Sequence, residues 1–182
     1  MDKEVQSRPS AEEPLEIERK FLIRYPDVSL LERICSRKAD MSQTYLRSEK
    51  KLSRRVRRRT INGEEDYWYN EKVKLSDTTR IERERQITEA QYRELLKEAI
   101  PDAQTIQKTR YDLPSGDLCF EIDIFPEWTD RAFAEVELEN EDQEFVFPDC
   151  LSIIKEVTED DRYTNSSLAR NGFVYDEIEG ES

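Results

Sequence analysis

The chain of 182 residues contains no histidine. This absence excludes a Ser-His-Asp triad, a Cys-His pair and an HExxH zinc helix, and it removes imidazole as a general base. Cysteine is also scarce: Cys35, Cys119 and Cys150 lie far apart in the sequence, and no CxxC pair occurs. The sequence therefore predicts neither a disulfide framework nor a zinc site, and we expect three buried free thiols.

Long apolar runs are absent as well. No window approaches the roughly 18 apolar residues that cross a bilayer, and the charged N-terminal segment has no apolar signal-peptide core. Basic residues are in the minority, with 29 Lys and Arg against 42 Asp and Glu, for a net charge of −13. Because that field repels nucleic acids and anionic lipids, we expect the protein to bind neither DNA nor membranes. The lack of a membrane span and of a signal-peptide core predicts a cytoplasmic protein.

The length fits one domain with loose ends. Residues 1–14 are polar and carry Pro9 and Pro14, and we expect them to form a disordered leader. The single domain is expected over residues 15–175, followed by an acidic disordered tail over residues 176–182.

Alternation of apolar and polar residues with period two dominates that domain, which predicts a mainly antiparallel β structure. The Asn62-Gly63 pair between two such runs predicts a type I′ hairpin. The expected strands are Leu15 to Ile23, Gln43 to Arg47, Ser53 to Ile61, Tyr67 to Leu75, Ile81 to Ile87, Thr105 to Leu113, Leu118 to Phe125 and Ala132 to Glu139.

Helices are predicted only in the connections between strands. Thr88 and Gln91 form a capping box, which starts a helix that Pro101 ends. Three further helices are expected, over Ser29 to Lys38, Pro148 to Ile154 and Asn165 to Asn171. Gly172 marks the end of the last one.

Charged residues share one face of nearly every expected strand. Glu16, Glu18 and Lys20 are in phase on the first strand, as Arg55 and Arg57 are on the third. For any single strand, a solvated face with ion pairs to neighbouring strands is enough to explain the in-phase charges. All the strands together favour an eight-stranded closed β-barrel, with helices packed outside and an interior wide enough for one small ligand. Charges enclosed in this way require water, a metal ion and a polyanion.

The types of residue indicate which ligand suits this interior. Clustered arginines and lysines donate charge-assisted hydrogen bonds to phosphate oxygens. Clustered carboxylates suit a hard divalent cation, which also holds substrate phosphates. Enzymes of phosphoryl transfer commonly combine, in one site, carboxylates that hold a metal ion and basic residues that bind phosphate.

The run Glu16-Ile17-Glu18-Arg19-Lys20 resembles the ExExK signature that opens the CYTH, or triphosphate tunnel metalloenzyme, superfamily. Further motifs follow in the order of that family, over about residues 15 to 173. They are Gln43-Thr44-Tyr45-Leu46, the RxR of Arg55 and Arg57, a lysine at 72 or 74, the RxExE of Arg80, Glu82 and Glu84, Lys108 and Arg110, Glu121 and Asp123, Glu-Val-Glu-Leu-Glu at 135 to 139, and Arg162-Tyr163-Thr164-Asn165-Ser166-Ser167-Leu168-Ala169.

The resemblance implies an eight-stranded tunnel that binds a triphosphate with Mg²⁺ or Mn²⁺ and hydrolyses it. The catalytic residues would be Glu18, with Lys20 and Arg57 stabilising the leaving phosphate. The metal ligands would be Glu16, Glu18, Glu121, Asp123, Glu137 and Glu139. The phosphate-binding residues would be Lys20, Arg55, Arg57, Arg59, Lys72, Lys74, Arg80, Lys108 and Arg110, and the supporting acids Glu82, Glu84 and Glu135. Lys72 and Lys74 both fit the phase of the family lysine.

The expected substrate is inorganic tripolyphosphate, hydrolysed to pyrophosphate and phosphate by metal-activated water. Three alternatives stay open: a class IV-type adenylate cyclase, an organic (thiamine or nucleoside) triphosphatase, and a non-catalytic polyphosphate-binding module. The sequence also leaves a homodimer open.

Overall fold

The computed structural model describes residues 15–180. The predicted leader, residues 1–14, and the last two residues of the predicted tail lie outside the described residues.

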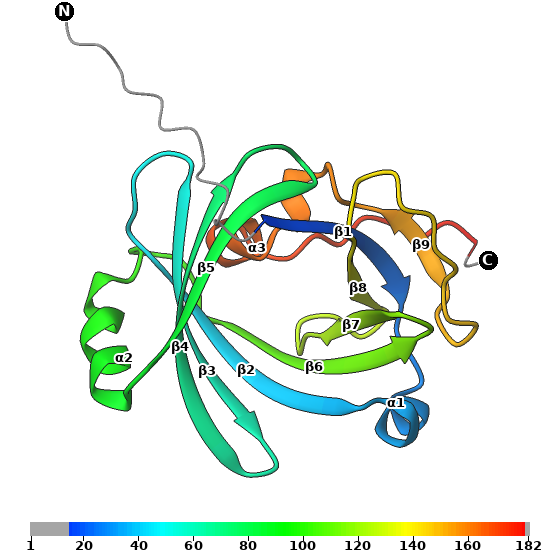
Figure 1. Cartoon of the computed structure of the whole chain (residues 1–182), viewed down its shortest axis with the longest axis horizontal. Coiled ribbons are helices and arrows are strands. Elements are labelled where there is room, and N and C mark those ends of the chain that lie inside the picture. The colour runs from blue at the N-terminus through cyan, green and yellow to red at the C-terminus, as the bar shows by residue number, and fades with distance from the viewer. Residues whose placement is uncertain (1–14, 181–182) are drawn as a thin grey trace, which may run out of the picture.

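Eight antiparallel strands form a closed barrel, as the alternation predicts (Figure 1). Their order around the barrel is β5-β4-β3-β2-β6-β7-β8-β1, and β1 pairs with β5 to complete the circle. The strands are β1 (Leu15–Arg24), β2 (Arg37–Leu46), β3 (Leu52–Ile61), β4 (Glu64–Lys74), β5 (Thr79–Ile87), β6 (Ile106–Ser115), β7 (Leu118–Ile124) and β8 (Arg131–Glu137).

One edge of β1 is shared between two partners. Leu15 to Ile17 pair with β5 and close the barrel, whereas Phe21 to Ile23 pair with a ninth strand, β9 (Ile153–Glu156). Beyond β9 the chain stays beside β1, where Val157 N donates to Lys20 O and Lys20 N donates to the Thr158 hydroxyl. The C-terminal segment therefore fills the part of the wall that β5 leaves uncovered.

Local signals in the sequence locate most turns and helix ends correctly. Asn62 and Gly63 have φ values of 50° and 80°, as a type I′ hairpin requires. The capping box of Thr88 and Gln91 starts α2 (Glu89–Leu95), which continues as a 3₁₀ turn (Leu96–Glu98). The helix α3 (Asn165–Asn171) ends at Gly172, whose φ of 90° favours glycine.

Two helix predictions need correction. The helix expected over Pro148 to Ile154 is wrong, because residues 149–150 form a turn and the chain joins β1 as β9 from Ile153 onward. The helix expected over Ser29 to Lys38 is too long. The observed α1 (Val28–Ile34) ends at the extended Cys35, and β2 then begins at Arg37, which pairs with Asp112 on β6.

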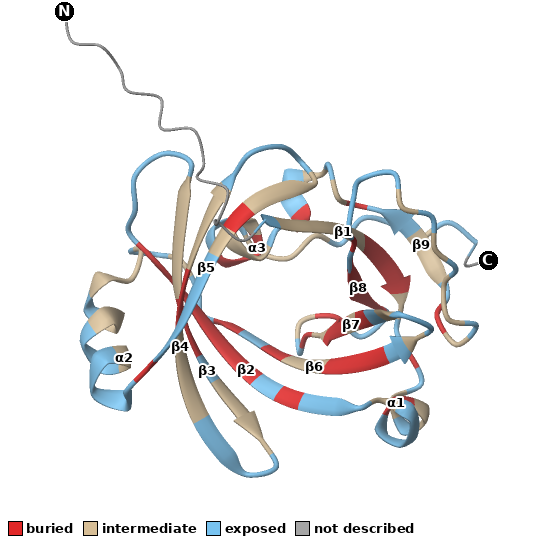
Figure 2. Cartoon of the chain, in the orientation of Figure 1, coloured by how far each residue is buried: buried red, intermediate tan, exposed pale blue. Residues whose placement is uncertain are grey.

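Apolar side chains cover the outside of the barrel in two places and fill one end of its inside. Leu31 of α1, with Phe145 and Phe147, covers the outer face of β1, β7 and β8, and α2 covers a smaller cluster on β3 and β4. Leu22 and Phe133 lie on the same faces as charged neighbours and pack inside against Trp128, Tyr163 and α3. The buried parts of β1, β2, β6, β7 and β8 follow these clusters (Figure 2).

Within residues 15–180, no helix is both long and apolar enough to cross a membrane. The three cysteines are free thiols, as expected. Cys119 is nevertheless exposed, and Cys35 and Cys150 are half-buried, so the expectation that all three are buried is wrong.

Candidate functional site

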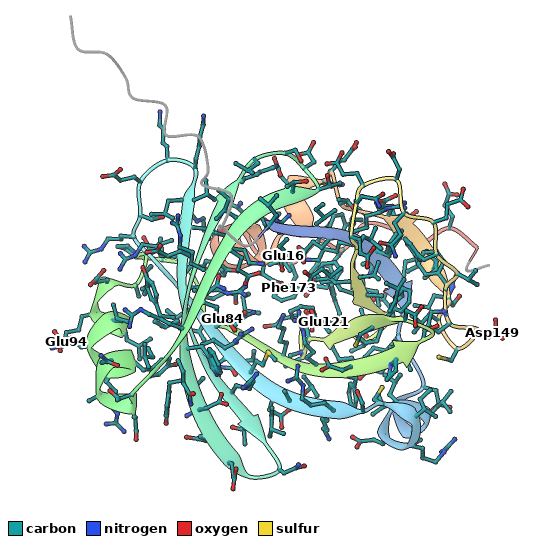
Figure 3. The ribbon with its side chains drawn as sticks, in the orientation of Figure 1. Glu16, Glu84, Glu94, Glu121, Asp149 and Phe173 are labelled. Carbon is teal, nitrogen blue, oxygen red and sulfur yellow. The ribbon has the colours of Figure 1, made fainter. Side chains whose placement is uncertain are left out.

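The interior of the barrel holds a cavity of about 750 Å³. Its lining includes ten basic and nine acidic side chains, so the wall is nearly neutral although the whole chain carries −13. Figure 3 shows Glu16, Glu84 and Glu121 pointing into the interior from β1, β5 and β7, while Glu94 and Asp149 lie on the outside. Glu94 lies on α2 and Asp149 in a turn, whereas the three inward glutamates lie on strands, where successive side chains point to opposite faces.

The arginines of β3 and the carboxylates of β8 lie on opposite sides of the cavity. Arg55, Arg57 and Arg59 line the cavity from β3, and Glu135 and Glu137 line it from β8. These two strands stand four places apart in the order of eight, and therefore face each other across the barrel. A ligand between them meets guanidinium donors on one side and carboxylate oxygens on the other.

Ion pairs connect the acidic residues of β1 with cations on β4 and β5. Lys72 Nζ lies 2.9 Å from Glu16 Oε2 and 3.7 Å from Glu82 Oε2. Arg80 Nη1 lies 2.7 Å from Glu18 Oε1. The barrel thus places the ExExK and RxExE motifs side by side at the seam where it closes.

Burial and the proximity of like charges raise the pKa values of two acids in this region, Glu16 and Glu137. Burial, with Glu18 and Glu82 nearby, raises the pKa of Glu16 to about 8 despite the opposing Lys72. Burial and the charges of Glu82 and Glu18 also raise the pKa of Glu137. Glu16, Glu18, Glu82 and Glu137 thus form an acidic region of the wall.

Lys20 lies where the charged wall meets the apolar end of the interior. Its Nζ is 3.2 Å from Glu135 Oε1 and 4.1 Å from the centre of the Phe133 ring. Burial opposes ionisation of Glu135, but Lys20 and Arg110 hold the pKa of that carboxyl well below its usual range. Glu135 is therefore the counter-charge of two cavity cations, Lys20 and Arg110.

The structure does not bring every predicted site residue to the cavity. Lys108 Nζ and Asp123 Oδ2 form a buried ion pair of 2.6 Å, with side chains 1% and 0% exposed. Arg110 lines the cavity and also binds Asp123, with Nε 2.6 Å from Oδ1. Glu139 lies beyond the end of β8 and is exposed. The lining residues of the described chain do not include Lys108, Asp123 or Glu139.

The two candidate lysines of β4 occupy different positions. Lys72 faces the interior among Glu16, Glu18 and Glu82, and although burial lowers its pKa, these acids raise it overall. Lys74 is about half exposed at the rim, where its Nζ pairs with Asp77 at 2.8 Å and Asp161 at 3.2 Å. Lys72 is the better candidate for the interior lysine.

The C-terminal segment contributes lining residues that sequence reasoning did not select. Thr158, Asp161, Thr164, Asn165 and Ser166 all border the cavity. The sequence motif over residues 162–169 contains three of them, but strand alternation does not predict the direction of side chains outside strands. The sequence analysis also did not select five other lining residues, namely Arg37, Met41, Lys51, Ser53 and Asn70.

The donor set fits a hard divalent cation without forming a ready-made metal centre. Glu16, Glu18 and Glu137 supply carboxylate oxygens, the ligands that Mg²⁺ and Mn²⁺ prefer. Across residues 15–180, however, no three acidic or thiol side chains converge closely enough to enclose an ion. The wall therefore suits a cation that completes its shell with water and substrate oxygens, as Mg²⁺ usually does.

Comparison with known proteins identifies relatives among solved structures. No family model matches the chain, and no curated protein matches its sequence. The inorganic triphosphatase NE1496 is 30% identical to this chain, with 85% of this chain and 93% of that one covered and a TM-score of 0.50. A conserved hypothetical protein from Pyrococcus furiosus is 19% identical over 70% of this chain and 80% of its own, with a TM-score of 0.55, and supports the fold alone.

Proposed function

The chain belongs to the CYTH, or triphosphate tunnel metalloenzyme, superfamily, and on that premise we propose that it hydrolyses inorganic tripolyphosphate to pyrophosphate and phosphate. The observation that carries the proposal is the pair of opposed walls, arginines on β3 and carboxylates on β8, across one cavity. The similar protein NE1496 is described as an inorganic triphosphatase.

Basic residues of the wall would bind the phosphate chain. Arg55, Arg57, Arg59, Lys72, Arg80 and Arg110 present donors toward the cavity. Lys20 and Arg57 would stabilise the charge that develops on the leaving pyrophosphate, because preorganised cations act most strongly where water is excluded.

The carboxylates would hold Mg²⁺ or Mn²⁺ through Glu16, Glu18 and Glu137. When bound, the cation would screen the phosphate charge and polarise the transferred phosphoryl group. Glu18 would orient the attacking water and accept its proton, since the chain has no imidazole. The water oxygen forms the new bond to the terminal phosphorus as the phosphoanhydride bond breaks, releasing phosphate and pyrophosphate.

The described cavity lining has no well-exposed aromatic ring, which favours an inorganic substrate over an organic one. Among the described lining residues the aromatic ones are Tyr45 and Tyr163, which are 5% and 0% exposed. Stacking on a base requires an accessible ring face. Most of the lining residues are charged or polar, and these groups would recognise the phosphate chain itself.

A phosphate-release panel tests the proposal. Tripolyphosphate, pyrophosphate, ATP, GTP and thiamine triphosphate are each incubated with Mg²⁺, Mn²⁺ or EDTA, and cyclic AMP is assayed in parallel. We expect the highest kcat/KM on tripolyphosphate and none in EDTA. Faster turnover of an organic triphosphate, or cyclic AMP with pyrophosphate, would replace the proposed substrate or reaction; tight tripolyphosphate binding without turnover would indicate a binding module.

A further inference from the structure

Gln43 belongs to the Gln-Thr-Tyr-Leu motif of β2, which the proposed function leaves unexplained. Its Cα partners are Arg57 on β3 and Ile106 on β6, and its neighbours at positions i±2, Met41 and Tyr45, line the cavity. The side chain therefore points inward. It is 0% exposed, and neither its amide nitrogen nor its amide oxygen has a hydrogen-bond partner within residues 15–180.

A buried amide without partners is costly. The group loses its hydrogen bonds to water and gains none in return, whereas methionine would fill a similar volume with no such loss. Because buried polar side chains in folded proteins are almost always bonded, the amide of Gln43 needs a partner that is not a protein atom.

The neighbouring polar atoms indicate which partner fits. Arg57 Nε and Asn70 Oδ1 are also buried and unpartnered within the described chain. Arg57 Nη2 donates to Glu84 Oε2 at 2.8 Å, and Asn70 Nδ2 lies 3.2 Å from the same oxygen. The guanidinium and the Asn70 amide are thus held together on the β5 side, while Gln43 stands on the β2 side.

The unpaired set combines donors and acceptors. Gln43 Nε2 and Arg57 Nε donate, whereas Gln43 Oε1 and Asn70 Oδ1 accept. A phosphate oxygen only accepts, so it would leave the two amide oxygens without a donor. Water both donates and accepts, so it satisfies this mixed set.

We propose that Gln43 holds a buried water against Nε of Arg57 and thereby fixes the plane in which that guanidinium faces the cavity. Gln43 is a positioning residue, since it acts through Arg57. The inference rests on the proposed function, in which Arg57 binds substrate phosphate. A fixed plane matters because a guanidinium recognises two phosphate oxygens through parallel hydrogen bonds.

Affinity for tripolyphosphate, measured by calorimetry in EDTA, tests the inference without metal or turnover. Gln43→Met should weaken binding about tenfold, the equivalent of one hydrogen bond, without lowering the thermal midpoint. Gln43→Glu should weaken it further, because the new carboxylate would pair with Arg57. In an Arg57→Lys background, Gln43→Met should cause no further loss. Wild-type affinity of Gln43→Met, or an undiminished loss in that background, would overturn the inference.

Gln107→Met is the matched control, since Gln107 lies on the exposed outer face of β6, where its Oε1 accepts from the Ser42 hydroxyl at 2.6 Å. It should bind tripolyphosphate like the wild type. A high-resolution crystal structure separates this inference from the proposed function. A water bonded to both Gln43 and Arg57 Nε supports the inference even if tripolyphosphate is not the substrate. Gln43 bonded directly to protein atoms refutes it even if tripolyphosphate is hydrolysed.

Discussion

Glu18 on β1 and Arg80 on β5 form an ion pair of 2.7 Å across the seam at which the barrel closes. The seam is short, since only three residue pairs join the two strands. The pair is also the meeting point of a proposed metal ligand and a proposed phosphate-binding residue. Substrate and cation would therefore compete with this ion pair and separate its two charges.

Replacing Glu18 by glutamine tests its role in hydrolysis. The amide still accepts a hydrogen bond from Arg80, so we expect the fold to persist, with an unchanged thermal midpoint. Metal-dependent release of phosphate from tripolyphosphate should fall about 100-fold or more, because a ligand of the polarising cation is lost. Glu94→Gln is the control, since Glu94 lies exposed on α2 beside Lys97. Activity retained by Glu18→Gln would remove Glu18 from the mechanism.

Lysine-to-methionine variants distinguish the two lysines of β4. Lys72 lies among the interior carboxylates, whereas Lys74 pairs at the rim with Asp77 and Asp161. We expect Lys72→Met to weaken tripolyphosphate binding about 10- to 100-fold, the value of a charged hydrogen bond, and Lys74→Met to change it less than about threefold. Calorimetric dissociation constants measure both. The reverse order of effects would make Lys74 the phosphate ligand.

The raised pKa of Glu16 predicts a pH-dependent stability in metal-free protein. Between the ordinary value of 4.5 and about 8, the carboxyl is protonated in the folded state and ionised in the unfolded state. Its contribution to the free energy of unfolding is therefore fully present below pH 4.5 and is lost as pH rises through about 8.

Glu16→Gln mimics the protonated acid and does not titrate. Relative to this variant, the wild type should lose at most about 1.4 kcal/mol of stability per pH unit across that window. Urea unfolding at pH 5, 6.5 and 8 in EDTA measures the difference, and Glu94→Gln should show no such trend. A difference that stays constant with pH would mean that Glu16 titrates normally.

The ion pair of Lys108 and Asp123 is predicted to be structural. Removing the acid by Asp123→Leu leaves buried Lys108 and Arg110 without this counter-charge and should cost about 3–5 kcal/mol of unfolding free energy. Lys108→Met should cost less, because Arg110 still pairs with Asp123. Replacing both, as Lys108→Met with Asp123→Leu, should cost less than the sum, although Arg110 also loses its partner. Chemical denaturation measures the three variants. Additive losses would show that the two side chains do not interact.

Sequence alone predicted the inner wall well because alternation determines the face on which each strand residue lies. Glu16, Arg57 and Glu137 were placed on the correct face in this way. Alternation does not determine how deep along the barrel axis a side chain lies. Lys108 has the same phase as the cavity-lining Arg110, yet it lies in a buried ion pair away from the cavity.

Tertiary pairing decided the features that local signals missed. Pro148 and Asp149 resemble a helix start, but the free edge of β1 recruits the following residues as β9. Likewise, no local pattern shows that Thr158 and Asp161 border the cavity, because their position depends on the partner of β1 rather than on their own sequence.

The pairing of β1 with β8 also governs the order in which the molecule can assemble. Glu18 lies opposite Glu137, so β1 meets β8 only after more than a hundred further residues have emerged from the ribosome. Until then the edge of β1 that pairs with β8 stays unpaired, which is a hazard for aggregation. Contacts so distant in sequence also slow the search for the native state. The architecture that encloses the charged cavity thus delays completion of its wall until β8 has been synthesised.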